Sequence, residues 1–131
     1  MELHVCAPGI AAPGLVGWEQ AVPALRGEAP YRPEPLPRFS PTMLPAIERR
    51  RTTAIIKLAL QAASEAMSGK PVDAPAAVFT SSEGDLDIVN HLCRALAQPR
   101  RMVSPTHFHN SVHNAPAGYW SIGSGVTAPS T

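Results

Sequence analysis

The chain has 131 residues and a mass of 13.9 kDa, which is the length of a single domain. Leu, Ile, Val and Phe together number 28. This share lies barely above the ~20% below which chains tend to be disordered, so we expect a thin core. Eleven Lys and Arg balance ten Asp and Glu, which excludes the strongly charged surface that nucleic acid or an anionic membrane would attract. No apolar run approaches the ~18 residues of a membrane-spanning helix.

The first segment and the cysteines favour a cytoplasmic protein. Residues 3–18 contain no Asp, Glu, Lys or Arg, but no basic residue precedes them and Pro8 and Pro13 interrupt them, unlike a secretory signal. Cys6 and Cys93 lie far apart and in no CxxC pair, so we expect no disulfide framework. We interpret both thiols as structural, because Cys6 has no basic neighbour to activate it and Cys93 lies on the apolar stripe of an expected helix.

The first forty residues predict two short elements. A short strand is expected over residues 3–5. Trp18, Val22 and Leu25 recur at the i, i+4 and i+7 spacing of a short helix that ends near Gly27. Residues 28–37 (EAPYRPEPLP) are rich in proline, so we expect an exposed connection there.

A long helix is expected next. Nine of the fifteen prolines lie in the first 45 residues and none lies in residues 46–69. Ser40 and Pro41 resemble an N-cap with proline at the first helical position, and Gly69 resembles a C-terminal stop. The apolar residues at helical spacing that we expect to face the core are Leu44, Ile47, Ile55, Leu58, Ala59, Ala62 and Ala66.

Three consecutive arginines, Arg49 to Arg51, lie within this expected helix. Adjacent residues on a helix point about 100° apart, so the three cannot form one compact patch. We interpret them as a solvated helix surface, with docking of an acidic carrier as the alternative.

The middle of the chain predicts a strand, a turn and a helix. Residues 76–80 (AAVFT) form a short apolar run that predicts a buried strand, and the serines and glycine at 81–84 predict a turn. Leu86, Val89, Cys93 and Leu96 follow at helical spacing, with acidic residues near the expected helix start. The turn lacks the GxxxxGK[ST] pattern of a phosphate site. Strand, turn and helix in this order indicate an α/β fold.

Residues 102–131 contain no Asp, Glu, Lys or Arg, which favours burial in a core or at a subunit interface. His107, His109 and His113 in this segment form an HxHxxxH array, a spacing that can bind zinc. No acidic residue lies within twenty positions of His109 to orient the imidazoles. We therefore expect hydrogen-bonded histidines and no metal or other cofactor, with a zinc site as the alternative.

The same segment resembles a known family. The residues that match the family pattern N-x-x-A-G-x-x-S-I-x-x-G are Asn114, Ala117, Gly118, Ser121, Ile122 and Gly125. This pattern forms a buried helix in the β-ketoacyl synthases of the thiolase superfamily, and the earlier elements, including AVFTSSEGD, occur in the family's order. The chain is most similar to the chain-length-factor-type, synthase-like proteins of aryl polyene biosynthesis. The resemblance implies an α/β, partial thiolase-like fold, with helices packed on a mixed β-sheet, and one incomplete N-terminal domain over residues 1–131.

The resemblance also bears on catalysis. Family members that condense acyl chains use a Cys nucleophile at the start of a helix and two later histidines, and residues 1–131 contain none of these positions. Residues 128–131 match the beginning of the strand that leads to the nucleophile. We therefore expect a fold cut short before that strand is complete, assign no catalytic residue, and expect the isolated chain to be marginally stable or oligomeric. A monomer with a cooperative melt would contradict this expectation.

The resemblance implies where ligands and partners bind. In the family, the region matching residues 110–122 lies close to the subunit interface and the acyl pocket. Asn110, His113, Asn114 and Ser121 are therefore the candidate pocket or interface residues. The implied partners are a β-ketoacyl synthase, in a homo- or hetero-oligomer, and an acyl carrier protein.

Three functions follow from these observations. The first is a non-catalytic, chain-length-factor-type component of fatty acid, polyketide or aryl polyene biosynthesis. The second is the N-terminal part of an active 3-oxoacyl-[acyl-carrier-protein] synthase, an acyltransferase, which a Cys shortly after Thr131 would indicate. The third is a small zinc hydrolase that uses His107, His109 and His113.

Overall fold

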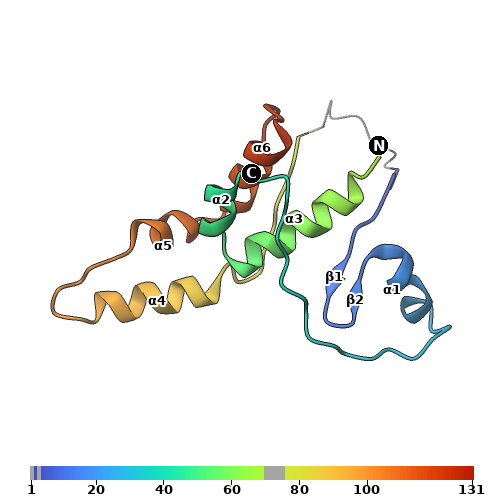
Figure 1. The fold of residues 1–131 in the computed structure, drawn as a ribbon, viewed down its shortest axis with the longest axis horizontal. Coiled ribbons are helices and arrows are strands. Elements are labelled where there is room, and N and C mark those ends of the chain that lie inside the picture. Colours follow the sequence, from blue (N-terminus) through green and yellow to red (C-terminus); the bar gives the residue numbers. More distant parts are fainter. Residues whose placement is uncertain (1, 3, 70–75) are drawn as a thin grey trace.

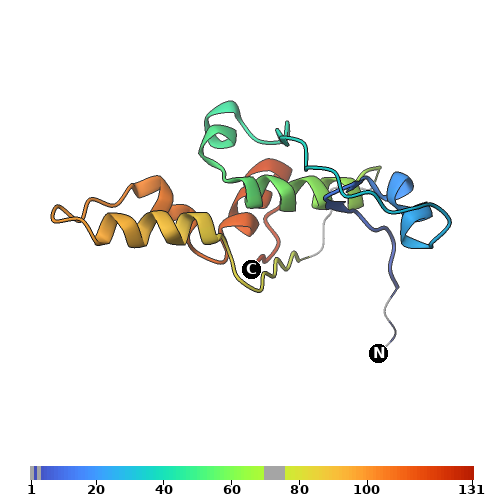
Figure 2. The same ribbon diagram turned by 90° about the horizontal axis from the view of Figure 1, so that it is seen from below.

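A computed structural model describes residue 2, residues 4–69 and residues 76–131. The elements are β1 (Ala11–Ala12), β2 (Leu15–Val16), α1 (Trp18–Leu25), α2 (Ala46–Arg51), α3 (Ala54–Ala66), α4 (Leu86–Leu96), α5 (Pro105–Asn110) and α6 (Ala115–Ser124). Helix α3 runs through the middle, with β1, β2 and α1 at one end and the pair α4 and α5 projecting beyond the other (Figure 1, Figure 2). No helix among the described residues is long and apolar enough to cross a membrane.

The core forms where α3 packs against α6. Its buried members are Leu44, Ile56, Leu60, Ala115, Tyr119 and Trp120, and the half-buried side chains packed on them are Met43, Ala63, Met67, Ala77 and Phe79. Leu60 is the one large side chain in this set with no exposed surface. The core is therefore small, as the low content of large aliphatic residues predicts.

The long helix predicted over residues 41–69 is interrupted. Thr52 lies between α2 and α3 with an extended backbone, and Thr53 caps α3 by accepting a hydrogen bond from the Ile56 N–H (3.3 Å). β-Branched threonine is stiff in a helix and a good N-cap, so two in a row favour a break. The prediction of one helix was wrong, because Ser40 and Pro41 begin a turn and Thr53 is the cap.

The core face of α3 also differs from the predicted stripe. Ile56 and Leu60 are 2% and 0% exposed, whereas Ile55, on the predicted stripe, is 44% exposed. A shift of one position rotates the face by about 100°. Helix α3 is apolar at both Ile55 and Ile56, so periodicity alone could not choose between them.

The first strands form a small antiparallel hairpin held against α3. The paired residues are Ala11 with Val16 and Ala12 with Leu15. The carboxylate of Glu65 on α3 accepts hydrogen bonds from the N–H groups of Ile10 (3.0 Å) and Trp18. A Cβ at Gly9 would lie 2.2 Å from the Ala62 carbonyl oxygen, so only glycine fits this close approach.

Other predictions for the N-terminal part have mixed outcomes. Leu3 lies outside the described residues, and His4 and Val5 belong to no strand, so the expected strand over residues 3–5 is wrong at the positions that can be tested. The helix from Trp18 and its end before Gly27 are confirmed. The connection over residues 28–37 is confirmed as mostly exposed and without regular structure.

Residues 76–80 form an extended edge and not the predicted buried strand. Ala77 pairs in parallel with Ser130, and the Ala77 N–H donates to the Pro129 carbonyl (3.1 Å) while the Thr131 N–H donates to the Ala77 carbonyl (3.0 Å). Val78 is exposed. The apolar run predicts a buried strand, but within the described residues it has a strand partner on one side only.

The boundaries of α4 are close to the predicted ones, but its buried face is not. Asp85 caps the helix by accepting a hydrogen bond from the Ile88 N–H (3.1 Å). Helix α5 packs on α4 and Ile88 is buried. The predicted core stripe, which includes Leu86 and Cys93, is exposed instead.

Within this chain, residues 102–131 are buried at Asn110 and over much of α6, whereas much of the segment before α6 is exposed. The buried residues are Asn110, Ala115, Ala117, Tyr119, Trp120 and Val126. Met102, Phe108 and Ile122 are exposed. The segment without charged residues therefore includes both a helix that is largely buried and apolar side chains that are exposed.

Truncation of a core residue tests which face of α3 is buried. We expect Leu60→Ala to lower the free energy of unfolding by about 2–5 kcal/mol, because it removes buried methyl groups and leaves a cavity. Ile55→Ala, one position off the core face, should cost much less. Urea denaturation followed by circular dichroism at 222 nm measures both, and equal losses would contradict the assignment.

Candidate functional site

The side-chain amide of Asn110 is buried, and each of its two polar atoms forms a hydrogen bond. Its Nδ2 donates to the Arg51 carbonyl oxygen (2.7 Å), and its Oδ1 accepts a hydrogen bond from the Tyr119 hydroxyl (3.2 Å). These bonds join α5 to the end of α2 and to α6. Asn110 therefore fixes α5 against α2 and α6, and it also borders a small cavity of about 40 Å³.

Burial and charges of both signs act on the hydroxyl of Tyr119. Burial raises the pKa of its hydroxyl, the nearby Glu48 carboxylate raises it further, and Arg51 opposes both. The ring of His109 meets the Tyr119 ring edge to face, with centroids 5.8 Å apart. These four residues and Ile122 border an open surface depression of about 370 Å³.

Ser121 and Asn114 have separate local environments. The Ser121 hydroxyl donates to the Val126 carbonyl oxygen (2.6 Å), which ties the end of α6 to the following segment beyond Gly125. Asn114 is exposed at the N-cap of α6, with no side-chain capping bond. The structure therefore does not bring Asn114 and Ser121 together with Asn110 and His113.

His113 borders an apolar cavity of about 590 Å³ that is open to the surface and lies between α3, the segment after Ala77 and the start of α6. The lining residues are Ala11, Ile55, Leu58, Ala59, Ala62, Phe79, Thr80, Ser81, His113 and Pro116. Ala59 and Ala62, which we had predicted to face the core, leave this space open because their side chains are small. The predicted stripe of α3 is thus the wall of a cavity.

The cavity adjoins a smaller one of about 40 Å³. Ile55, Ser81, His113 and Pro116 border both spaces, and Asp85 and Ser111 are among the additional lining residues of the smaller one. The Oδ2 of Asp85 is buried and has no hydrogen-bond partner among the residues that the structure describes. The smaller space is large enough for about one water molecule.

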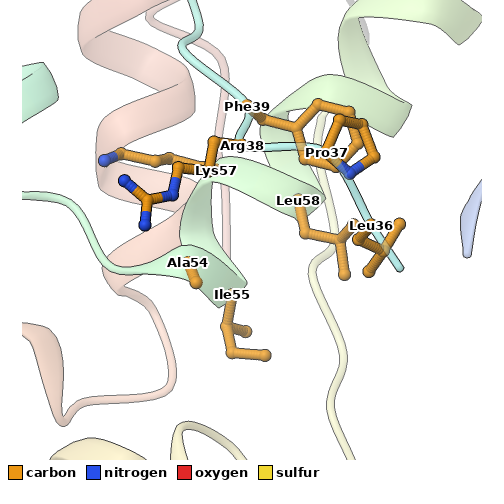
Figure 3. A pocket seen from close by; sticks show the side chains of 8 residues that line it. All are labelled: Leu36, Pro37, Arg38, Phe39, Ala54, Ile55, Lys57 and Leu58. Atoms are coloured by element: carbon orange, nitrogen blue, oxygen red, sulfur yellow. The ribbon is translucent and has the colours of Figure 1, made fainter. Parts of the chain in front are cut away.

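A second pocket, of about 420 Å³, lies on the other side of Ile55 and Leu58. Its lining residues are Leu36, Pro37, Arg38, Phe39, Ala54, Ile55, Lys57 and Leu58. Figure 3 shows Arg38 and Lys57 extending toward one side, with Leu36, Pro37 and Leu58 toward the other. The sequence does not indicate this pocket, because residues 28–37 resemble a plain connection and the two cations meet only after the chain folds over α3.

The three histidines of the HxHxxxH array point to different surroundings. The ring of His107 lies against that of His91, with centroids 5.3 Å apart, while His109 contacts Tyr119 and His113 lines the cavity. Among the residues that the structure describes, no group of three or more His, Cys, Asp or Glu could hold a metal ion.

The fold and the cavity define a partial thiolase-like ketosynthase architecture. Residues 19–131 match the family described as beta-ketoacyl synthase, N-terminal domain, and the chain therefore belongs to this family. This confirms the resemblance and the fold class inferred from the sequence.

A solved structure extends this comparison. The chain is similar to a chain of the ketosynthase (ApeO) in complex with its chain length factor (ApeC) from Xenorhabdus doucetiae, with a TM-score of 0.78 and 28% identity. The match covers 99% of this chain and 53% of that one, so the chain spans about half the length of this relative. A comparison with curated proteins found no match.

The hydroxyl of Tyr119 provides a test of the Asn110 contact. We expect Tyr119→Phe to lower the free energy of unfolding by about 1–3 kcal/mol, because a buried acceptor loses its donor. Because the Tyr119 pKa is raised above 10.0 in the folded chain, this contribution is complete below the unfolded pKa and declines as the pH rises through the folded value. Urea denaturation at pH 8 and pH 11 measures this, and a difference between wild type and variant that is larger at pH 11 would contradict it.

Proposed function

We propose that this chain is a non-catalytic, chain-length-factor-type component of a β-ketoacyl synthase assembly and that it forms one wall of the space that holds an acyl chain. The main observation that supports this proposal is the 590 Å³ cavity beside Ala59 and Ala62. It lies in a chain of the β-ketoacyl synthase N-terminal domain family. This coincidence of an apolar cavity and a ketosynthase-type fold supports an acyl ligand.

The lining of the cavity suits an alkyl chain. Leu58, Phe79 and the two alanines supply apolar surface, and each buried methylene contributes about 0.8 kcal/mol to binding. The volume falls within the range of about 300–1,000 Å³ that ligand pockets have. His113 and Pro116 at the start of α6 stand at one boundary, where they limit how far a chain extends.

The two cysteines support a non-catalytic role for this chain. Acyl transfer through a covalent intermediate needs a thiolate with an activating base. Cys6 and Cys93 are both free and exposed, and neither is among the lining residues of the cavity. We propose that condensation takes place on a partner ketosynthase, as the complex of ApeO with its chain length factor suggests by similarity.

The second pocket suits the partner that delivers the acyl group. Arg38 and Lys57 give the pocket two positive charges, and none of its lining residues is acidic. An acyl carrier protein is anionic at its phosphate-bearing arm, so we propose that this pocket faces it. We further propose a role in fatty acid, polyketide or aryl polyene biosynthesis and, because both thiols are free, a cytoplasmic location.

Filling the cavity with a large side chain should weaken the binding of an acyl chain. We expect the chain to bind decanoyl-N-acetylcysteamine, a soluble acyl thioester, and Ala59→Phe to weaken this binding at least tenfold because the ring occupies the acyl space. Ala46→Phe, which adds the same ring at an exposed position of α2, is the matched control. Isothermal titration calorimetry measures all three proteins, and binding that survives in Ala59→Phe would contradict the proposal.

Intact-mass spectrometry tests the absence of a covalent step. After incubation with the same thioester at pH 7.5, we expect the mass of the chain to remain unchanged, since neither exposed thiol lines the cavity that we propose to hold the acyl chain. A decanoyl adduct that disappears in Cys6→Ser or Cys93→Ser would identify an acylated cysteine. That outcome would overturn the non-catalytic role but not the acyl cavity.

A further inference from the structure

The second pocket is amphipathic, with apolar side chains along one part and two cations along another. Its apolar members include Leu36, Pro37 and Leu58, and its charged members are Arg38 and Lys57. In Figure 3 the two cations extend to one side of the pocket, and these three apolar residues lie on the other. The pocket therefore offers separate surfaces to a charged group and to an apolar one.

Two segments that are separate in the sequence build this pocket. Residues 36–39 belong to no helix or strand and lie over the start of α3, where four of the residues 54–58 complete the lining (Figure 3). Leu36 and Phe39 are half-buried, and the ring of Pro37 between them fixes its own φ angle. The apolar part is thus held by packing and by a restricted backbone, so little conformational freedom is lost when a ligand binds.

The two cations have no negative partner in this part of the structure. None of the lining residues is acidic, and neither Arg38 nor Lys57 forms an ion pair within the part of the chain that the structure describes. Lys57 is half-buried beside apolar side chains, so solvent screens its charge less and its attraction for an anion is stronger. The whole chain has a net charge of only +1. Two unpaired cations in one pocket are therefore a local feature and not a consequence of composition.

We propose that the second pocket binds an alkyl chain that ends in an anionic group, a carboxylate or a phosphate monoester, with this group between Arg38 and Lys57. A guanidinium binds both kinds of anion through paired hydrogen bonds, and the ammonium adds a second positive charge. The volume of about 420 Å³ lies within the range of about 300–1,000 Å³ that ligand pockets have. The carrier contact proposed above requires the two cations but not the apolar side chains beside them. A fatty acid held here would occupy those cations and so compete with the carrier.

The proposal rests on the second pocket and not on the acyl cavity, and the two sites can be separated. Ile55 and Leu58 border both spaces, whereas Ala59 lines only the acyl cavity and residues 36–39 line only the second pocket. Ala59→Phe therefore fills the acyl cavity and leaves the second pocket unchanged. Signals from residues 36–39 report on the second pocket in the wild-type chain as well, so the test does not depend on the folding of Ala59→Phe.

Titrations with simple amphiphiles test the ligand class. Wild type and Ala59→Phe are titrated at pH 7.5 with octanoate, octyl phosphate, 1-octanol and butyrate, and the backbone amide signals are followed by NMR spectroscopy. We expect at least one of the two eight-carbon anions to shift signals within residues 36–39 and 54–58. The uncharged 1-octanol should bind about fivefold more weakly or worse, and butyrate, which lacks four methylenes, about tenfold more weakly or worse. Binding of octanoate identifies a free fatty acid as the ligand, and binding of octyl phosphate alone identifies a phosphate-bearing lipid.

Variants of the lining assign the two halves of the ligand. Arg38→Gln/Lys57→Gln should weaken binding of the anion to the level of 1-octanol and leave 1-octanol unchanged, because only the charge interaction is lost. Arg100→Gln, which removes a charge at an exposed position between α4 and α5, is the matched control and should leave binding unchanged. Leu36→Ser should weaken the anion and 1-octanol by the same factor, because it removes apolar surface that both contact. Circular dichroism establishes that each variant is folded.

Four outcomes would overturn the inference. They are the absence of shifts at residues 36–39, equal binding of 1-octanol and the anions, anion binding that Arg38→Gln/Lys57→Gln does not affect, and inorganic phosphate that binds as strongly as octyl phosphate. The last outcome would assign the pocket to a phosphate group without an alkyl chain. The decanoyl thioester is uncharged, so its binding should be unchanged in Arg38→Gln/Lys57→Gln. Failure of the second pocket and failure of the acyl cavity therefore give different results.

Discussion

The buried amide of Asn110 is the contact on which the arrangement of the helices depends. Its Nδ2 donates to the Arg51 carbonyl at the end of α2, where the helix offers that oxygen no partner, and its Oδ1 accepts from Tyr119 on α6. A buried amide is costly unless it is satisfied on both sides. The break after Arg51, the end of α5 and the rotation of α6 are therefore set together. The first turn of α6 carries Pro116, which borders the apolar cavity beside His113.

Helix α3 presents three kinds of side chain, one to α6, one to the cavity and one to the hairpin with α1. Leu60 packs into the core with α6, the small Ala59 leaves room for the cavity, and the Glu65 carboxylate accepts N–H groups at the start of the hairpin and of α1. Each of these three contacts requires a side chain of a different size and polarity. The small core is thus compatible with a sizeable cavity, because α3 presents different residues to each and only Phe79 both packs on the core and lines the cavity.

Local signals predicted where several elements begin and end. The helix from Trp18 stops before Gly27, and Asp85 caps α4 among the acidic residues that mark its start. The buried faces were harder, because α3 and α4 are apolar on more than one side and only the packing of α6 and α5 selects among them. The resemblance led to His113, which the structure finds in the cavity. Arg38 was not predicted as a site residue, because Lys57, the other cation of the second pocket, lies nineteen positions away in the sequence.

The parallel contact between Ala77 and Ser130 has a consequence for the order of folding. The two residues lie 53 positions apart, and α4, α5 and α6 all lie in the loop between them. Parallel pairing needs such a crossover, and its entropy must be lost before the few hydrogen bonds of the bridge are gained. We expect packing of α6 on α3 to bring the two segments together first, so that the bridge closes late. Until then the edge at residues 76–80 is open to strands of other chains, which makes this stage the one most exposed to misassembly.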